Sequence, residues 1–350
     1  GSGSQEVANQ YYSTCLFSNC ILAVVIMVFS LVFIENITSI FNIPKELSLD
    51  VSWLMSLMLL SFIVRLPDHS FSAAPFVTER LDVVAYGEIL SSVVRIIVIC
   101  FLFFVFPPNI AYLGIVAVIV ALFNMIYLNR MSSNLMPGLK FSLTHVRLDI
   151  LKSLLASGRW SAINSAGAIL LSSSSLIIIN LLHMSNEAGN YAISMFFTTL
   201  LTGIIAVICA VFTPRALNLY ASHSKNDFNK EVFFSQKAVS VLMVPIVLCI
   251  ILLSDNFFIL WIPLEYNSDI VNLTRVLLCS VVVQSTVWTL TNVSLAKDKL
   301  RIPALVLIAM SVINVFVSAI LLANTEEVMV LAMSSTLTGL LFYVVVITKY

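Results

Sequence analysis

Residues 129–159 read NRMSSNLMPGLKFSLTHVRLDILKSLLASGR, the longest gap between apolar stretches in this chain of 350 residues. Five basic residues fall in it, at Arg130, Lys140, Arg147, Lys152 and Arg159, and Pro137-Gly138 interrupt it. The rest of the chain is very different, because 60% of all residues are hydrophobic and only 10% are charged. Since about a quarter of the residues of soluble domains are charged, this composition predicts a protein that lies mainly in a membrane.

The apolar stretches on both sides of this gap are long enough to span a membrane as helices. About 20 mainly apolar residues cross the hydrocarbon core, and a helix satisfies all of its backbone groups there. Barrel strands would alternate over about ten residues, which these stretches do not. The sequence therefore predicts an all-α, polytopic membrane protein with ten transmembrane helices, at about residues 14–34, 51–77, 89–106, 110–128, 160–182, 191–212, 238–259, 274–296, 302–323 and 328–348.

Basic residues are distributed unevenly between the gaps. Fourteen of the eighteen Lys and Arg residues fall in every second gap, whereas Lys45 alone falls in the alternate gaps. Three further arginines, Arg65, Arg95 and Arg275, lie inside or at the edge of spans. Short loops rich in Lys and Arg stay on the cytoplasmic side. We therefore expect a multi-pass protein with both chain ends in the cytoplasm.

The gap at residues 129–159 divides the chain into a helical bundle of four spans, residues 1–128, and one of six spans, residues 160–350. From Ser142 the alternation of apolar and polar residues predicts an amphipathic helix at the cytoplasmic surface, although a simple connecting helix fits equally well. Many transporters consist of two related bundles. The four-plus-six count therefore suggests a six-plus-six transporter without its first two spans.

Six short motifs occur along the chain in a characteristic order: Ala8-Asn9-Gln10-Tyr11-Tyr12-Ser13-Thr14, Glu79-Arg80-Leu81-Asp82, Ala188-Gly189-Asn190-Tyr191, Thr213-Pro214-Arg215-Ala216-Leu217, Leu260-Trp261-Ile262-Pro263 and Ala296-Lys297-Asp298-Lys299. In order and spacing they resemble the polysaccharide flippases (Wzx-type, O-antigen) of the multidrug/oligosaccharidyl-lipid/polysaccharide superfamily. The resemblance extends over nearly the whole chain.

This resemblance implies two six-helix bundles, of which the first helical hairpin is missing here. It also implies a function: flipping a polyprenyl-pyrophosphate-linked oligosaccharide across the bacterial inner membrane for O-antigen, capsule or exopolysaccharide synthesis. The implied partners are the lipid-linked oligosaccharide, membrane lipids and a coupling ion, proton or sodium.

The span at residues 51–77 carries the densest set of ionisable residues. Arg65, Asp68 and His69 are spaced at i, i+3 and i+4, which predicts one shared helical face. Pro67 and Pro75 predict a kink or break in the same span, because proline removes a backbone donor. Since a charge in the bilayer costs a few kcal/mol or more, ionisable residues in a span are candidates for function.

Arg95 lies in the next span, at a depth that permits an ion pair with Asp68. Such a pair would leave Arg65 free to bind an anion, and His69 could add charge on protonation. Because arginine grips phosphate through two donors, a lipid pyrophosphate is a plausible ligand. We therefore predict a cationic cavity containing Arg65, Asp68, His69 and Arg95. Alternatively, Arg95 extends to the membrane surface and Arg65 with Asp68 forms a structural ion pair.

Uncharged polar residues in other spans, among them Ser172 and Gln284, are typical of helix packing, with a cavity role as the alternative. At the edge of its span, Arg275 is expected to extend to the membrane surface.

The cysteines form no CxxC motif, and no HExxH, GxSxG or P-loop sequence is present. We therefore expect no metal site, no cofactor, no enzyme activity and no nucleic-acid partner. The alternatives to a flippase are a cation-coupled multidrug exporter of the same superfamily and, less favoured, a membrane enzyme of glycan synthesis.

Overall fold

The computed structural model describes residues 2–41, 43, 47–78, 80–182, 185–222, 225–264, 266–296, 300–325 and 327–347, which form helices and connections without a β-strand. Lys45, Lys297, Lys299 and Lys349, on which part of the expected sidedness depends, lie outside these ranges. Within them, ten helices are long and apolar enough to cross a membrane. This confirms the predicted all-α, polytopic architecture.

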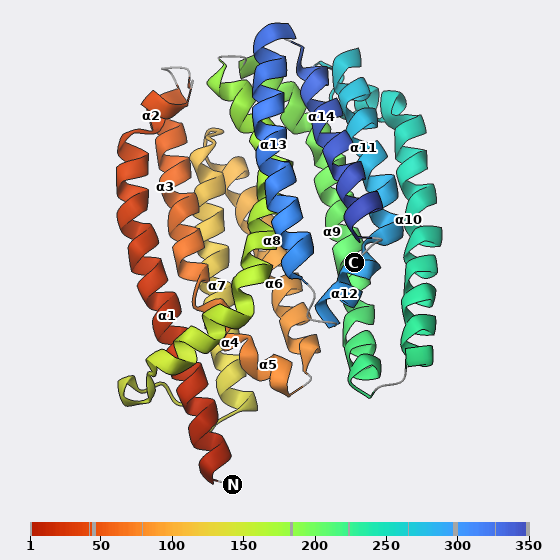
Figure 1. Cartoon of the computed structure of the whole chain (residues 1–350). Coiled ribbons are helices and arrows are strands. Elements are labelled where there is room, and N and C mark those ends of the chain that lie inside the picture. The colour runs from red at the N-terminus through yellow and green to blue at the C-terminus, as the bar shows by residue number, and fades with distance from the viewer. Residues whose placement is uncertain are drawn as a thin grey trace. The chain divides into compact units, whose positions relative to one another are not determined.

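The chain divides into two compact units, residues 1–157 and 158–350. The first unit contains α1 (Ser2–Glu35), α2 (Ile37–Ile40), α3 (Ser48–Arg65), α4 (Asp68–Phe71), α5 (Ala73–Val77), α6 (Leu81–Val105) and α7 (Ala111–Leu135). Within this unit α3 packs along α7, and α1 lies beside α3 (Figure 1). The span predicted at residues 51–77 is therefore three helical segments in succession, as its two prolines indicated.

A glycine allows α3 and α7 to approach closely. A Cβ atom added to Gly114 of α7 would lie 2.7 Å from Leu57 Cβ and 3.1 Å from the Leu54 carbonyl oxygen of α3. Small residues at helix contacts are the usual means of close packing in membranes, where lipid and side chains are equally apolar.

The second unit contains most of α8 (Leu148–Leu181), followed by α9 (Ser185–Ala221), α10 (Lys225–Trp261), α11 (Ser268–Val287), α12 (Thr289–Ala296), α13 (Arg301–Thr325), α14 (Val328–Leu341) and a π-helical turn, η3 (Phe342–Ile347). The central helix is α11, which contacts α9, α10 and α14. Of the residues in its most apolar stretch, 56% are buried. By contrast, α1 and α6 of the first unit each have 6% buried. Large apolar side chains such as Phe104, Leu252 and Phe316 are exposed.

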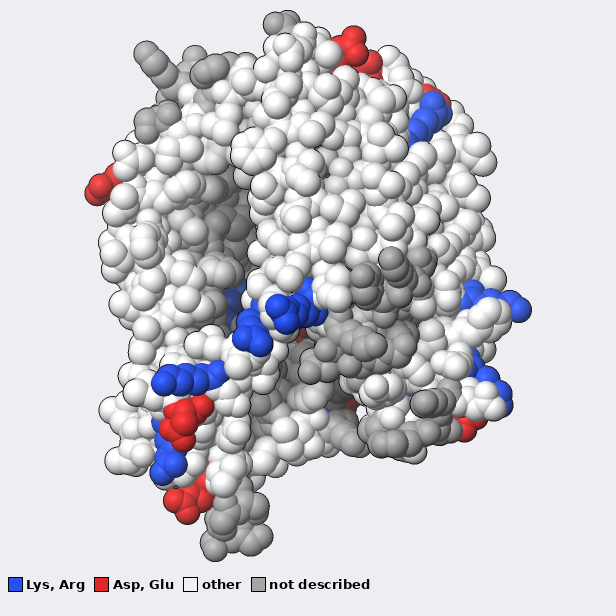
Figure 2. Space-filling model, in the orientation of Figure 1, with Lys and Arg blue, Asp and Glu red and all other residues white. Residues whose placement is uncertain are grey.

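The exposure of so many large apolar side chains is expected for a protein surrounded by lipid. Extensive exposed apolar surface is rare on soluble monomers. In the view of Figure 2, broad areas of the surface carry neither acidic nor basic side chains. The protein is therefore a multi-pass membrane protein.

The connection between α7 and α8 differs from the expected amphipathic helix. Residues 143–145 form a single 3-10 turn, η2 (Leu143–His145), and α8 begins at Leu148 and continues without a break to Leu181. The backbone before α8 is instead held by side chains of α1. Asn9 Oδ1 accepts from Lys140 N at 3.2 Å, and Ser13 Oγ accepts from Ser142 N at 3.2 Å. These side chains satisfy backbone amides that have no acceptor in a helix, and the helix expected from Ser142 begins six residues later, at Leu148.

Candidate functional site

The break between α3 and α4 determines how the ionisable residues of the first unit are presented. Arg65 is the last residue of α3, Pro67 precedes α4, and Asp68 is its first residue. Arg65 and His69 are exposed, whereas Asp68 is only 7% exposed. The turn at the proline therefore separates residues that an unbroken helix would have placed on one face.

Asp68 points into the packed interior of the first unit. Its Oδ2 accepts a hydrogen bond from Asn124 Nδ2 of α7 at 3.2 Å, and Ser91 Oγ of α6 lies 3.5 Å from Asn124 Oδ1. Oδ1 of Asp68 is also buried and has no hydrogen-bond partner among the described residues. A buried carboxylate oxygen without a donor is costly, and a proton or a bound cation would reduce that cost.

Arg65 faces an acidic residue that sequence reasoning did not select. Its Nη2 lies 3.9 Å from Glu88 Oε1 of α6, and both side chains are about half exposed or more, at 49% and 61%. At this distance and exposure the ion pair is weak, and both groups remain available to a ligand.

The ion pair considered between Arg95 and Asp68 does not form, because Asp68 is directed to Asn124 instead. Arg95 is exposed on α6, seven residues after Glu88. Seven residues are nearly two helical turns, so Arg95 lies on the same face of α6 as Glu88, about 10 Å further along the helix. Arg65, Glu88 and Arg95 thus form an exposed charged row.

Glu88 and Asn124 were missed for different reasons. Glu88 directly precedes the apolar stretch predicted from residue 89, but α6 begins at Leu81 and carries Glu88 well inside the helix. Asn124 is a lone amide in the middle of an apolar span, and this isolation was the feature of the sequence that could have identified it as a candidate. Its role depends on the contact between α4 and α7, which no local pattern reveals.

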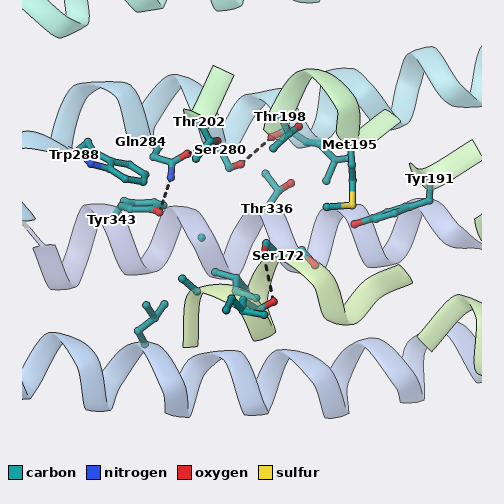
Figure 3. A pocket seen from close by; sticks show the side chains of 17 residues that line it. Ser172, Tyr191, Met195, Thr198, Thr202, Ser280, Gln284, Trp288, Thr336 and Tyr343 are labelled. Atoms are coloured by element: carbon teal, nitrogen blue, oxygen red, sulfur yellow. Dashed lines mark hydrogen bonds between the residues drawn. The ribbon is translucent and has the colours of Figure 1, made fainter. Parts of the chain in front are cut away.

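The second unit contains a cavity of about 290 Å³ lined by residues of α8, α9, α11, α13, α14 and η3. None of the described residues that line it is charged. Figure 3 shows Trp288, Gln284 and Tyr343 at one end, and Tyr191 at the other. Gln284 Nε2 donates to the Tyr343 hydroxyl at 2.8 Å, and Thr202 Oγ1 donates to Gln284 Oε1 at 3.3 Å. Ser172 also lines this cavity, so both Ser172 and Gln284 lie at a cavity, which was the alternative to helix packing.

Among the described residues, no cluster of three or more His, Cys, Asp or Glu side chains is arranged to hold a metal ion. Arg275 of α11 does not extend freely to the surface as expected. It forms an ion pair with Asp255 of α10, and its Nε donates to the Ile251 carbonyl oxygen at 3.2 Å. These bonds are structural links between α10 and α11.

No protein-family model matches the chain. Over 325 residues it is 24% identical to the uncharacterized membrane protein EpsK of Bacillus subtilis (strain 168), an alignment covering 91% of this chain. The chain thus spans about 63% of the length of that relative.

Solved structures of membrane transporters share the fold. An inward-facing multidrug resistance MATE family transporter of the MOP superfamily superimposes with a TM-score of 0.75 at 13% identity, covering 100% of this chain and 81% of that one. The MATE transporter VcmN of Vibrio cholerae gives a TM-score of 0.68 at 11% identity, with 97% and 82% covered. The chain therefore has a MATE-like transporter fold.

Proposed function

We propose that this protein flips a polyprenyl-pyrophosphate-linked oligosaccharide from the cytoplasmic to the outer leaflet of a bacterial inner membrane, with both chain ends in the cytoplasm. The lipid tail would remain in the bilayer while the pyrophosphate and sugars cross through a hydrated path. The product would supply synthesis of a cell-surface polysaccharide such as O-antigen, capsule or exopolysaccharide. A MATE-like fold supports a transporter working by alternating access, since such folds consist of two bundles.

The observation that carries this proposal is the pair of exposed arginines, Arg65 and Arg95, on membrane-spanning helices whose nearest buried acid, Asp68, is turned inward. Arginine in a span is rare and usually marks a ligand path. Its planar group bonds two phosphate oxygens at once. Displacing the weakly held Glu88 from Arg65 would free that guanidinium for a pyrophosphate.

Asp68 is our candidate for coupling to an ion. Its unpartnered Oδ1 could bind a proton or sodium, and its bond to Asn124 links α4 to α7. Binding there would change the charge inside the first unit and so bias its packing, which is how a local ionic event can drive a change between two conformations.

A cation-coupled multidrug exporter is the second candidate. The solved transporters with this fold include a multidrug resistance MATE family member, and Asp68 and Glu88 could serve a cationic drug. A glycan-pathway enzyme is disfavoured because these similar structures are transporters.

Complementation in a bacterial strain lacking its own flippase tests the proposal, using the full-length protein. We expect Arg65→Ala to lower surface glycan at least tenfold at equal protein level, and Arg95→Ala to lower it too. Arg80→Ala is the matched control, because Arg80 pairs at the surface with Asp82 and we expect normal glycan. Normal glycan with Arg65→Ala, together with lost resistance to cationic drugs, would instead establish the exporter.

A further inference from the structure

The cavity of the second unit has a chemistry unlike that of the charged row on the first. Its described lining is uncharged and combines three aromatic rings with hydroxyl and amide groups (Figure 3). Transferring a charged ligand into such a site without a counter-charge is costly, whereas a neutral ligand with polar edges meets partners there. The cavity therefore selects against a pyrophosphate.

The hydrogen-bonding groups at the aromatic end retain unused capacity. Gln284 uses one amide hydrogen for Tyr343 and one lone-pair direction for Thr202, which leaves another of each. The Tyr343 hydroxyl accepts from Gln284 and still carries its own proton. By contrast, the hydroxyls of Ser172 and Ser280 donate to carbonyls of their own helices. Gln284 and Tyr343 are thus the groups free to bond a ligand.

Thr198 adds a further hydroxyl at the cavity. Its Oγ1 is buried without a hydrogen bond among the described residues, and the residue lines the cavity wall on α9. Rotation about the Cα–Cβ bond to another staggered rotamer would redirect this hydroxyl. Unsatisfied buried hydroxyls are uncommon in native proteins, and this one can bond a ligand in the cavity.

Size and shape narrow the class of ligand. A cavity of about 290 Å³ is large enough for one six-membered sugar ring. A sugar ring has apolar C–H faces, which pack on aromatic rings, and hydroxyl edges, which bond amides and hydroxyls. Trp288 and Tyr343 supply such rings beside Gln284.

We propose that this cavity binds one uncharged sugar ring, packed against Trp288 and Tyr343 and hydrogen-bonded to Gln284 and Thr198. The inference rests on the proposed function and deepens it, because the cavity would be the subsite that recognises one sugar of the cargo, separate from the arginines proposed to bind its pyrophosphate.

Direct binding to the whole protein in lipid nanodiscs tests this. The probes are the methyl glycosides of glucose, galactose and N-acetylglucosamine, with benzyltrimethylammonium as the cation. Trp288 emission is followed in a variant where Trp53, Trp160 and Trp261 are replaced by phenylalanine. Calorimetry on the unmodified protein gives a second measurement that needs no tryptophan replacement. We expect saturable binding of at least one glycoside in the millimolar range and none of the cation.

Thr198→Val is the decisive variant, because it preserves shape and removes only the unpartnered hydroxyl. We expect sugar affinity to fall at least fivefold while the melting temperature stays equal or rises. Thr199→Val is the matched control, since its neighbour Thr199 is exposed and outside the cavity lining. We expect no change in sugar affinity with it.

Three outcomes would overturn the subsite: binding of the cation alone, binding of neither probe, or sugar binding that Thr198→Val leaves unchanged. Each would leave the proposed flippase function standing if Arg65→Ala still abolishes surface glycan. Conversely, sugar binding that depends on Thr198 would stand even if Arg65→Ala had no effect on glycan. The two experiments therefore fail independently.

Discussion

Asn124 donates a hydrogen bond from Nδ2 to Oδ2 of Asp68 at 3.2 Å, and this bond joins two helices 56 residues apart in the sequence. Asp68 has no other side-chain hydrogen bond among the described residues, and its second oxygen is buried without a donor. The pair is therefore a direct polar link between α4 and α7.

Asn124→Leu should destabilise the first unit strongly. It removes the donor and leaves the Asp68 carboxyl buried without a partner, which costs about 1–3 kcal/mol or more for a charged group. Thermal unfolding of the detergent-solubilised protein measures the loss. In an Asp68→Asn background the same substitution should cost less, because an amide replaces the carboxyl. Additive effects of the two substitutions in a double-mutant cycle would contradict this coupling.

Gly114→Ala should also lower stability, for a steric reason. The added methyl would lie 2.7 Å from Leu57 Cβ, so α3 and α7 would have to separate. Overpacking of this kind typically costs about 1–3 kcal/mol. Gly203→Ala in α9 is the matched control, because a Cβ there meets nothing within 4 Å. Since alanine is the better helix former, the control should be neutral or gain up to about 1 kcal/mol. Equal melting temperatures for the two variants would refute the close approach.

Ser13→Ala should loosen the connection that precedes α8. Ser13 Oγ accepts from Ser142 N and lies 3.4 Å from the Lys140 carbonyl oxygen, while Thr14 Oγ1 accepts from Arg147 N at 3.1 Å. Losing about 1 kcal/mol of local stability should speed trypsin cleavage after Lys140 and Arg147 roughly fivefold.

Ser18→Ala is the control for this variant. The Ser18 hydroxyl bonds only to the Thr14 carbonyl within α1, so it does not hold the connection and cleavage should proceed at the original rate. Peptide mapping of timed digests gives both rates. Unchanged cleavage in Ser13→Ala would show that α1 does not restrain this segment.

The transmembrane spans were predictable from the sequence because the length of each apolar stretch is enough to identify them. The ends of the helices were harder to predict. Helix α10 begins at Lys225, whereas its apolar stretch was placed from residue 238, because charged residues outside the hydrocarbon continue the same backbone hydrogen bonds. The break after Arg65 was also predictable, since Pro67 cannot donate to the helix.

The polar contacts of the candidate site were not predictable in the same way. Depth along a helix permitted a pair between Arg95 and Asp68, but helix rotation decides which side chains meet, and α4 turns Asp68 toward Asn124. The cavity at Gln284 forms only where segments far apart in the sequence, from α8 to η3, bring hydroxyls and aromatic rings together. For Ser172 and Gln284, the sequence showed polar residues in apolar spans but not that they line the same cavity. That Arg65 and Arg95 bind the substrate remains a prediction.

Arg275 provides a last test, because its contacts distinguish arginine from lysine. One side of its guanidinium pairs with Asp255, and Nε donates to the Ile251 carbonyl oxygen at 3.2 Å, so a single planar group serves two acceptors on α10. Tyr266 holds Asp255 in place from the other side, with its hydroxyl 3.4 Å from Oδ1. Lysine carries a point charge and cannot reproduce this fork. We therefore expect Arg275→Lys to lower stability nearly as much as Arg275→Ala, by about 1–2 kcal/mol. Asp255→Asn should cost less, because the bond to Ile251 survives and a half-exposed ion pair contributes only about 0.2–1 kcal/mol. Melting temperatures of the three variants give this order, and a lysine variant as stable as the original protein would show that charge alone, not the fork, joins α10 to α11.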